Sequence, residues 1–169
     1  VYGMIYSGTA PSSKSSPSGP LISQIEKARK DPDVKAVVLD MNTPGGEVTA
    51  TDEAHHALKK LREDGKPVVT CMRAIAASGG YYLAAGTDHI VANRLTLTGS
   101  VGVIIGGYNY AELLDKIGLE SELYIGGEMK DVLNMARERT PEEIALIQSL
   151  VDETYNEFVK IVAAGRPLS

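Results

Sequence analysis

Residues 34–72 read as a strand, a helix and a second strand, and this order leaves few architectures open. Residues 34–41, V-K-A-V-V-L-D-M, form a nearly continuous apolar run, which is typical of a strand in a sheet covered on both faces. Residues 47–64 carry an apolar helical face that ends at Gly65, and residues 66–72, K-P-V-V-T-C-M, read as the next strand. The pattern predicts an α/β fold with a mostly parallel sheet, in a single domain spanning residues 1–169.

The same reading extends along the rest of the chain. It predicts strands at 1–7, 88–93, 97–105 and 120–124, helices at 21–30, 110–117 and 140–164, and a solvated loop at 8–20. Thr140, Pro141 and Glu143 form the pattern of a capping box at the start of the last helix. The chain opens inside an apolar run and stops in a loop-like segment, so we expect a fragment of a longer protein.

Composition excludes several classes of function. The net charge is −5 and no block of lysine and arginine occurs, which argues against a nucleic-acid groove. No apolar run reaches the length of about 18 residues that a transmembrane helix needs. The one cysteine, Cys71, excludes an internal disulfide and is expected to be a small core residue.

A serine stands at a predicted strand-to-helix boundary. Ser78 follows the 66–72 strand through a run of small residues and precedes Gly79, Gly80 and an apolar stretch that suits a helix. Small neighbours let a substrate carbonyl approach the hydroxyl, and backbone N–H groups at a helix start can hold an oxyanion. The pattern indicates a nucleophile at Ser78, and an ordinary helix N-cap is the alternative interpretation.

A second glycine turn, Pro44-Gly45-Gly46, follows the 34–41 strand. Sites in open α/β sheets form beyond the carboxyl ends of the strands, where both glycine turns would lie. The N–H of Gly79 and that of Gly45 or Gly46 would then face one oxygen and form an oxyanion hole. A tight strand-to-helix turn without any catalytic role is the alternative, because glycine is the usual residue there.

A serine nucleophile needs a base, and the histidines are poorly placed for that role. His55 and His56 lie almost three turns into the 47–64 helix, away from the end expected to meet Ser78. His89 begins the strand at the opposite end of the predicted sheet. A Ser-His-Asp triad is therefore disfavoured.

A lysine is the other candidate base. A lysine amine acts as a base only when it is neutral, which requires burial or a dry pocket. Lys130 follows Gly126-Gly127 and lies among apolar residues that could desolvate it, although a solvated loop lysine is the alternative. Ser100, in T-G-S-V-G, would hydrogen-bond and orient such an amine, or is simply a turn serine.

Four motifs occur in an order that resembles one family. They are N-T-P-G-G (42–46), A-S-G-G-Y-Y-L-A-A (77–85), T-G-S-V-G-V-I (98–104) and G-E-M-K-D (127–131). Together they resemble the signal peptide peptidase A family, also called protease IV, over nearly the whole chain. The resemblance implies a Clp/crotonase-like fold of stacked strand-strand-helix units and a serine peptidase with a Ser/Lys dyad that needs no cofactor or metal.

The resemblance also implies a role for each motif residue. Ser78 would be the nucleophile, Lys130 the general base and Ser100 the residue that holds the base. Gly79 with the Gly45-Gly46 turn would form the oxyanion hole. The implied enzyme is held at the cytoplasmic membrane by an N-terminal helix outside this chain, and its peptidase domain lies on the outer side. It degrades signal-peptide remnants and other apolar peptides as a homo-oligomer, here an octamer, whose active sites draw on neighbouring subunits.

One segment departs from the family pattern, and two rival functions stay open. After Lys130 the family usually reads K-D-x-G-S-P, whereas this chain has K-D-V-L-N-M, which leaves the substrate preference open. A crotonase-type acyl-CoA enzyme would use paired glycine N–H groups with Asp40 and Glu47 as acid and base. A non-catalytic oligomeric scaffold of the same fold is the other rival.

Overall fold

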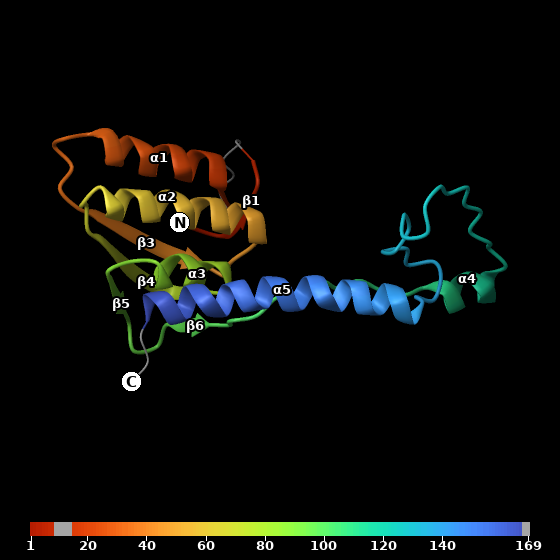
Figure 1. Cartoon of the computed structure of the whole chain (residues 1–169). Coiled ribbons are helices and arrows are strands. Elements are labelled where there is room, and N and C mark those ends of the chain that lie inside the picture. Colours follow the sequence, from red (N-terminus) through yellow and green to blue (C-terminus); the bar gives the residue numbers. More distant parts are fainter. Residues whose placement is uncertain (9–14, 167–169) are drawn as a thin grey trace. The chain divides into compact units, whose positions relative to one another are not determined.

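The computed structural model describes residues 1–8 and 15–166 (Figure 1). They form two compact units. The first contains Val1–Gly102 and the chain from Asn156 onward, and the second contains Val103–Tyr155. The first unit therefore carries the predicted nucleophile, Ser78, and the second carries the predicted base, Lys130.

A four-stranded parallel sheet forms the centre of the first unit. Its strands are β3 (Val37–Thr43), β4 (Val68–Ala77), β5 (His89–Ala92) and β6 (Leu97–Gly99). The long strand β4 pairs with β3 on one side and with β5 and then β6 on the other. The predicted α/β class with a mostly parallel sheet is confirmed. β4 runs past its predicted end at residue 72, because the small residues before Ser78 continue the pairing with β6.

Helices cover one face of this sheet (Figure 1). They are α1 (Ser18–Lys30), α2 (Val48–Glu63) and α3 (Gly79–Ala85). The apolar face predicted for the second helix is buried, and it consists of Ala50, Ala54, Ala57, Leu58 and Leu61. The other face of the sheet is open in this chain: Val38 is 68% exposed and Val91 49%. The prediction of cover on both faces is therefore wrong for the described residues, since local hydropathy does not reveal which segment provides the cover.

The N-terminal segment lies along the end of β3. β1 (Met4–Tyr6) and β2 (Ser15–Pro17) form a two-stranded parallel sheet. Single bridges join Tyr2 to Asn42 and Ile5 to Gly46. Part of the predicted loop at 8–20 falls at 9–14, outside the described residues. From residue 15 onward that prediction is wrong, because this part of the chain pairs with β1 and then starts α1.

The second unit contains α4 (Ala111–Ile117) and the first part of α5 (Pro141–Gly165). The predicted capping box is confirmed: the Glu143 N–H donates to Thr140 Oγ1 at 3.3 Å, and the Thr140 N–H donates to Glu143 Oε2 at 2.9 Å. The strand predicted at 120–124 is absent, and the strand predicted at 97–105 is limited to β6. Leu123 and Tyr124 are 52% and 90% exposed, because the alternating segment finds no strand to pair with in its own unit.

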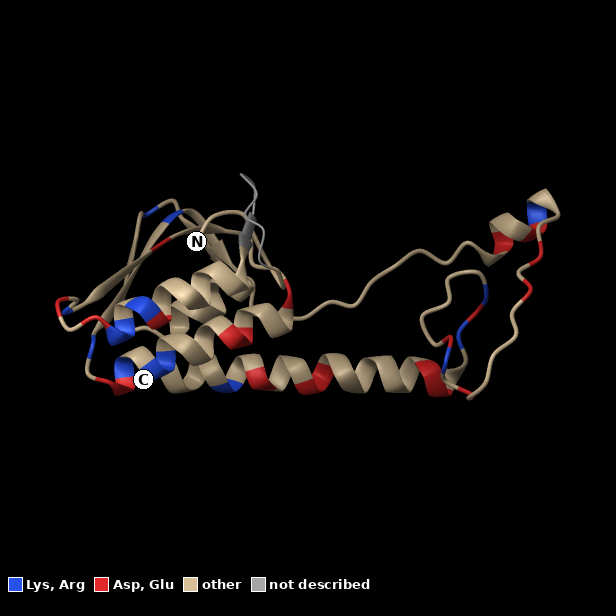
Figure 2. Ribbon diagram, turned by 90° about the horizontal axis from the view of Figure 1, so that it is seen from above, with Lys and Arg blue, Asp and Glu red and all other residues tan. Residues whose placement is uncertain are grey.

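Acidic and basic residues both occur along the ribbon (Figure 2). This distribution fits the net charge of −5. Within the part of the chain that the structure describes, no helix is both long and apolar enough to cross a bilayer.

Candidate active site

Ser78 occupies the sharp turn between β4 and α3 in a strained backbone conformation. Its φ of 52° and ψ of −122° belong to a region that glycine tolerates and other residues rarely enter. Hydrogen bonds fix the residue on both sides: its N–H donates to Gly99 O at 2.9 Å, and its carbonyl accepts the Tyr82 N–H at 2.9 Å. Its side chain makes no capping hydrogen bond to the helix, so the hydroxyl is not committed to the N-cap role. A strained serine on a strand-to-helix turn is the arrangement that exposes nucleophilic serines in other folds.

The strain at Ser78 leads to a stability prediction. We expect Ser78→Gly to be more stable than Ser78→Ala by about 1–2 kcal/mol, because glycine relieves a conformational cost of about 1–3 kcal/mol but loses unfolded-state entropy. Ser149, which is exposed inside α5, is the control. At this position the glycine variant should be less stable than the alanine variant by about 1 kcal/mol, since glycine is a poor helix former. Urea unfolding of the four variants measures this, and equal stability of the two Ser78 variants would refute the strained turn.

The two glycine turns meet at Ser78. Gly45 has a φ of 99°, and a Cβ atom added to it would lie 2.6 Å from the Gly79 nitrogen and 2.8 Å from Ser78 Cβ. No side chain fits at these distances, so glycine is required both for its conformation and for the close approach. The structure thus brings the Pro44-Gly45-Gly46 turn against the start of α3, as expected from the parallel order of β3 and β4.

Hydrogen bonding distinguishes the two glycines of this turn. The Gly45 N–H is occupied, since it donates to Thr43 Oγ1 at 3.1 Å. Among the described residues the N–H groups of Gly46 and Gly79 have no hydrogen-bond partner. A Cβ atom added to Gly79 would lie 3.4 Å from the Gly46 nitrogen, so the two free donors are neighbours. Such a pair beside a serine hydroxyl can bind one developing negative charge on oxygen.

Ser100 follows β6 as Ser78 follows β4. The register pairs Ala77 with Gly99, so the two serines come one residue after the last paired positions of neighbouring strands. Ser100 also has a φ of 52° and is exposed. The structure therefore brings Ser100 beside Ser78, at the same edge of the sheet.

Lys130 lies in the second unit, in a turn closed by its own N–H donating to Gly127 O at 3.1 Å. It is exposed, and the nearby apolar residues Met129 and Leu133 are themselves 42% and 57% exposed. The surroundings expected to desolvate Lys130 are therefore not provided by the residues next to it in the sequence.

An ion-pair cluster holds the segment after Lys130. Arg137 donates to Asp131 through Nε (2.8 Å to Oδ2) and Nη2 (2.9 Å to Oδ1), and it also binds Glu143 at the start of α5. Hydrogen bonds from Arg137 lower the pKa values of both carboxyl groups to about 2. The residue next to Lys130 is thereby tied to the helix start.

This cluster predicts an acid-labile segment. Both carboxyl pKa values are depressed in the folded state, so the stabilisation is complete above about pH 4.5 and is lost as pH falls toward 2. The protection of amides 130–135 against hydrogen exchange, relative to the intrinsic rate at each pH, should fall over that range. In Arg137→Gln this protection should already be low at pH 6, whereas Lys116→Gln, which affects only an exposed pair on α4, should behave like the unchanged protein. Slow exchange at pH 6 in Arg137→Gln would show that the cluster does not hold this segment.

Comparisons with known proteins show the family of this chain. The model of peptidase family S49 matches residues 60–169. The chain belongs to peptidase family S49. It is 40% identical over 145 residues to a putative signal peptide peptidase SppA of Enterococcus faecium, which covers 86% of this chain and 42% of that protein.

Two further relatives carry protease names. The chain is 41% identical over 145 residues to Protease 4 of Salmonella typhi (85% of the chain, 23% of the relative) and 37% identical over 150 residues to the chloroplastic serine protease SPPA of Arabidopsis thaliana (88% and 22%). The chain therefore spans less than half the length of these relatives. Membership of family S49 agrees with the predicted Clp/crotonase-like class of fold.

The histidines of this S49 chain lie away from Ser78. His55 is buried against the Tyr82 ring, with ring centroids 5.2 Å apart, and burial lowers its pKa. Its imidazole faces Gly86, at the opposite end of α3 from Ser78. His56 is exposed, and His89 pairs with Val69 near the start of β4.

Both candidate carboxylates for an acyl-CoA reaction are already engaged. Arg73 donates to Asp40 from Nε at 2.7 Å and from Nη2 at 3.1 Å, which holds the pKa of Asp40 near 2. Glu47 accepts the Ser7 N–H at 2.6 Å, which lowers its pKa. Neither carboxyl group is poised to exchange a proton near neutral pH. The described residues also contain no cluster of potential metal ligands.

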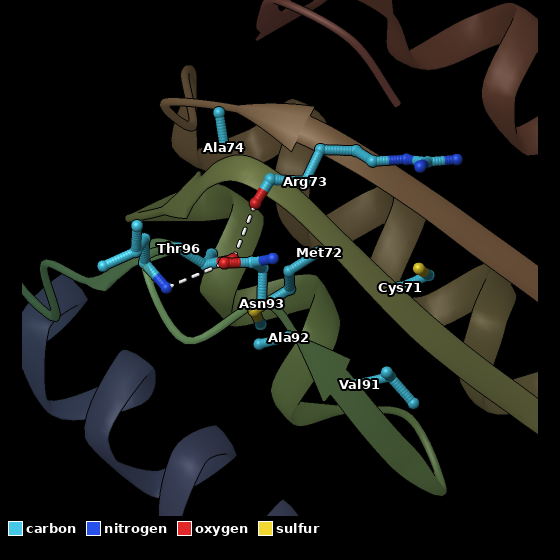
Figure 3. Close-up of a pocket in the computed structure, with 9 residues that line it drawn as sticks. Cys71, Met72, Arg73, Ala74, Val91, Ala92, Asn93 and Thr96 are labelled. Carbon is cyan, nitrogen blue, oxygen red and sulfur yellow. Dashed lines mark hydrogen bonds between the residues drawn. The ribbon is translucent and has the colours of Figure 1, made fainter.

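A cavity of about 610 Å³ lies near β4 and β5 and includes neither Ser78 nor the glycine turns in its lining (Figure 3). Its walls are mostly apolar, and Cys71 and Val91 contribute to them. Two of its lining residues are bonded to each other: the Thr96 hydroxyl donates to the Arg73 carbonyl at 2.7 Å. Arg73 extends toward β3, where it pairs with Asp40. The lining of the cavity is thus distinct from Ser78 and the two glycine turns.

Proposed function

We propose that this chain is the catalytic part of an S49 serine endopeptidase with a Ser/Lys dyad. The observation that carries the proposal is the strained Ser78, whose hydroxyl does not cap α3 and which adjoins two N–H groups without partners. Neutral Lys130 takes the Ser78 proton as the hydroxyl oxygen attacks a peptide carbonyl. Lys130 then protonates the leaving amine, and water activated by the same amine releases the acyl group.

The N–H groups of Gly46 and Gly79 are proposed as the oxyanion hole. They would hold the carbonyl oxygen as it becomes negative in the tetrahedral intermediate. Loss of one such donor typically lowers kcat by about 10²–10³-fold. Ser100, at the neighbouring strand end, is proposed to orient the Lys130 amine.

We further propose that the enzyme is a homo-oligomer, an octamer, and that neighbouring subunits complete its active sites. Two observations on the second unit support this. Lys130 is exposed in its own chain, whereas a lysine base must be neutral and therefore desolvated. The unit also exposes large apolar side chains that soluble proteins normally bury, including Ile104 (95%), Tyr108 (86%) and Tyr124 (90%).

The proposed substrates are signal-peptide remnants and other apolar peptides, and the proposed location is the outer side of the cytoplasmic membrane. The names of two relatives, a signal peptide peptidase and Protease 4, support the substrate class. The acyl-CoA alternative is less well supported, because Asp40 and Glu47 are held as carboxylates by other groups.

The test uses the full-length protein, an apolar peptide and a short acyl-CoA. Peptide hydrolysis that increases from pH 7 to pH 9 without turnover of the thioester supports the proposal, because the lysine base must be deprotonated. Thioester turnover without peptide hydrolysis would establish the crotonase alternative. If the assembled protein shows neither activity, the non-catalytic oligomeric scaffold is the remaining alternative.

Co-expression of Ser78→Ala with Lys130→Ala tests the shared site. If Ser78 and Lys130 of one site come from neighbouring chains, mixed oligomers recover roughly a quarter of the unchanged activity, since random mixing pairs an intact Ser78 with an intact Lys130 at that frequency. If both residues come from the same chain, mixing restores nothing.

A further inference from the structure

Thr43 is a buried polar residue just before the Pro44-Gly45-Gly46 turn, and the proposed mechanism gives its side chain no role. Its side chain is fully buried at the end of β3. The hydroxyl donates to Gly3 O at 2.5 Å and accepts the Gly45 N–H at 3.1 Å. A hydroxyl has one proton, so the bond to Gly3 leaves only lone pairs to face the Gly45 N–H.

The next peptide group is fixed from its other side. The Gly45 carbonyl accepts the Ile5 N–H at 2.9 Å. In a planar trans peptide the C=O and the following N–H point in opposite directions. The Gly46 N–H therefore points away from Ile5, and its nitrogen faces Gly79. Thr43 and β1 together hold the orientation of the turn.

We propose that Thr43 is a positioning residue: by binding the Gly45 N–H and the N-terminal segment, it makes Gly46 the partner of Gly79 in the oxyanion hole. The inference rests on the proposed peptidase function. Without the hydroxyl, the Gly45 N–H loses its acceptor and the Pro44–Gly45 peptide loses its anchor, so the bond from Ile5 to the Gly45 carbonyl holds the turn alone. The Gly46 N–H then no longer stabilises the oxyanion in the transition state, so kcat falls, whereas substrate binding changes little.

The test compares Thr43→Val, which keeps the shape, with Thr43→Ser, which keeps the hydroxyl. The control is Thr70→Val. Thr70 is equally buried on β4, but its hydroxyl bonds Thr87 and not the turn. In the full-length protein we expect Thr43→Val to lower kcat roughly 10–100-fold, with KM within about threefold. We expect Thr43→Ser to restore most of kcat, and Thr70→Val to leave it unchanged.

Several outcomes would overturn the inference. They are a folded Thr43→Val with unchanged kcat, an equal loss in Thr70→Val, or no recovery in Thr43→Ser. If Thr43→Val does not fold, Thr43→Cys replaces it. A thiol is a weaker acceptor than a hydroxyl, so the kcat of this variant should lie below that of Thr43→Ser, and a kcat equal to the unchanged one refutes the role. The proposed function fails separately: in that case the unchanged protein shows no peptide hydrolysis, or Ser78→Ala retains it, whatever Thr43 does.

Discussion

Ser78→Ala is expected to lower kcat for peptide hydrolysis by about 10⁴–10⁶-fold, and Lys130→Ala nearly as much. The nucleophile and its base act as a unit, so the double variant should be no worse than either single variant. The measurement is kcat at saturating apolar peptide with the full-length, assembled protein. A loss that multiplies in the double variant would show that the two residues act independently.

Two further variants serve as controls for this result. Lys116→Ala removes an exposed lysine from the same unit and should leave kcat within about twofold, since exposed ion pairs contribute little. Ser100→Ala should cause a smaller loss than either dyad variant, because Ser100 is proposed to orient the amine without reacting. Full activity in Ser78→Ala or Lys130→Ala would refute the dyad.

Gly45→Ala is expected to abolish activity and to destabilise the fold by about 2–4 kcal/mol. The added Cβ would lie 2.6 Å from the Gly79 nitrogen, 2.8 Å from the Ala77 oxygen and 2.8 Å from Ser78 Cβ. Relief of this overlap has to move backbone, and the cost of overpacking adds to that of a positive φ. The start of α3 and the Ser78 turn are the groups that move, so kcat falls with stability.

Gly65→Ala is the matched control for that prediction. Gly65 also has a positive φ, of 82°, but no atom lies within 4 Å of an added Cβ. The Gly65→Ala variant should lose about 1–2 kcal/mol of stability from the positive φ alone and keep its kcat. Urea unfolding and kcat of both variants separate the two effects. Equal behaviour of the two variants would mean that the close approach at Gly45 has no catalytic importance.

Local signals in the sequence predicted much of the first unit and one helix start in the second. The Ser78 turn, the buried face of α2 and the capping box of Thr140 and Glu143 each depend on residues close in sequence. The meeting of the two glycine turns also followed from the sequence, because parallel neighbouring strands end at the same edge.

Contacts between distant segments were not predictable in the same way. The bonds that β1 makes with the glycine turn join residues about 40 positions apart, such as Ile5 and Gly45, and no local pattern announces them. The role of Thr43 had one usable signal: a threonine two residues before a glycine often binds that glycine's N–H. The expectation for Lys130 rested on its apolar neighbours in sequence, whereas the structure leaves both it and them exposed.

Fluorophosphonate labelling of the full-length protein, with the modified residue located by mass spectrometry, tests the central claim most directly. The reagent reports an activated serine without knowledge of the substrate. The account predicts labelling at Ser78 that increases from neutral to alkaline pH and disappears in Lys130→Ala. Labelling at another serine, or labelling at Ser78 that Lys130→Ala leaves unchanged, would contradict it.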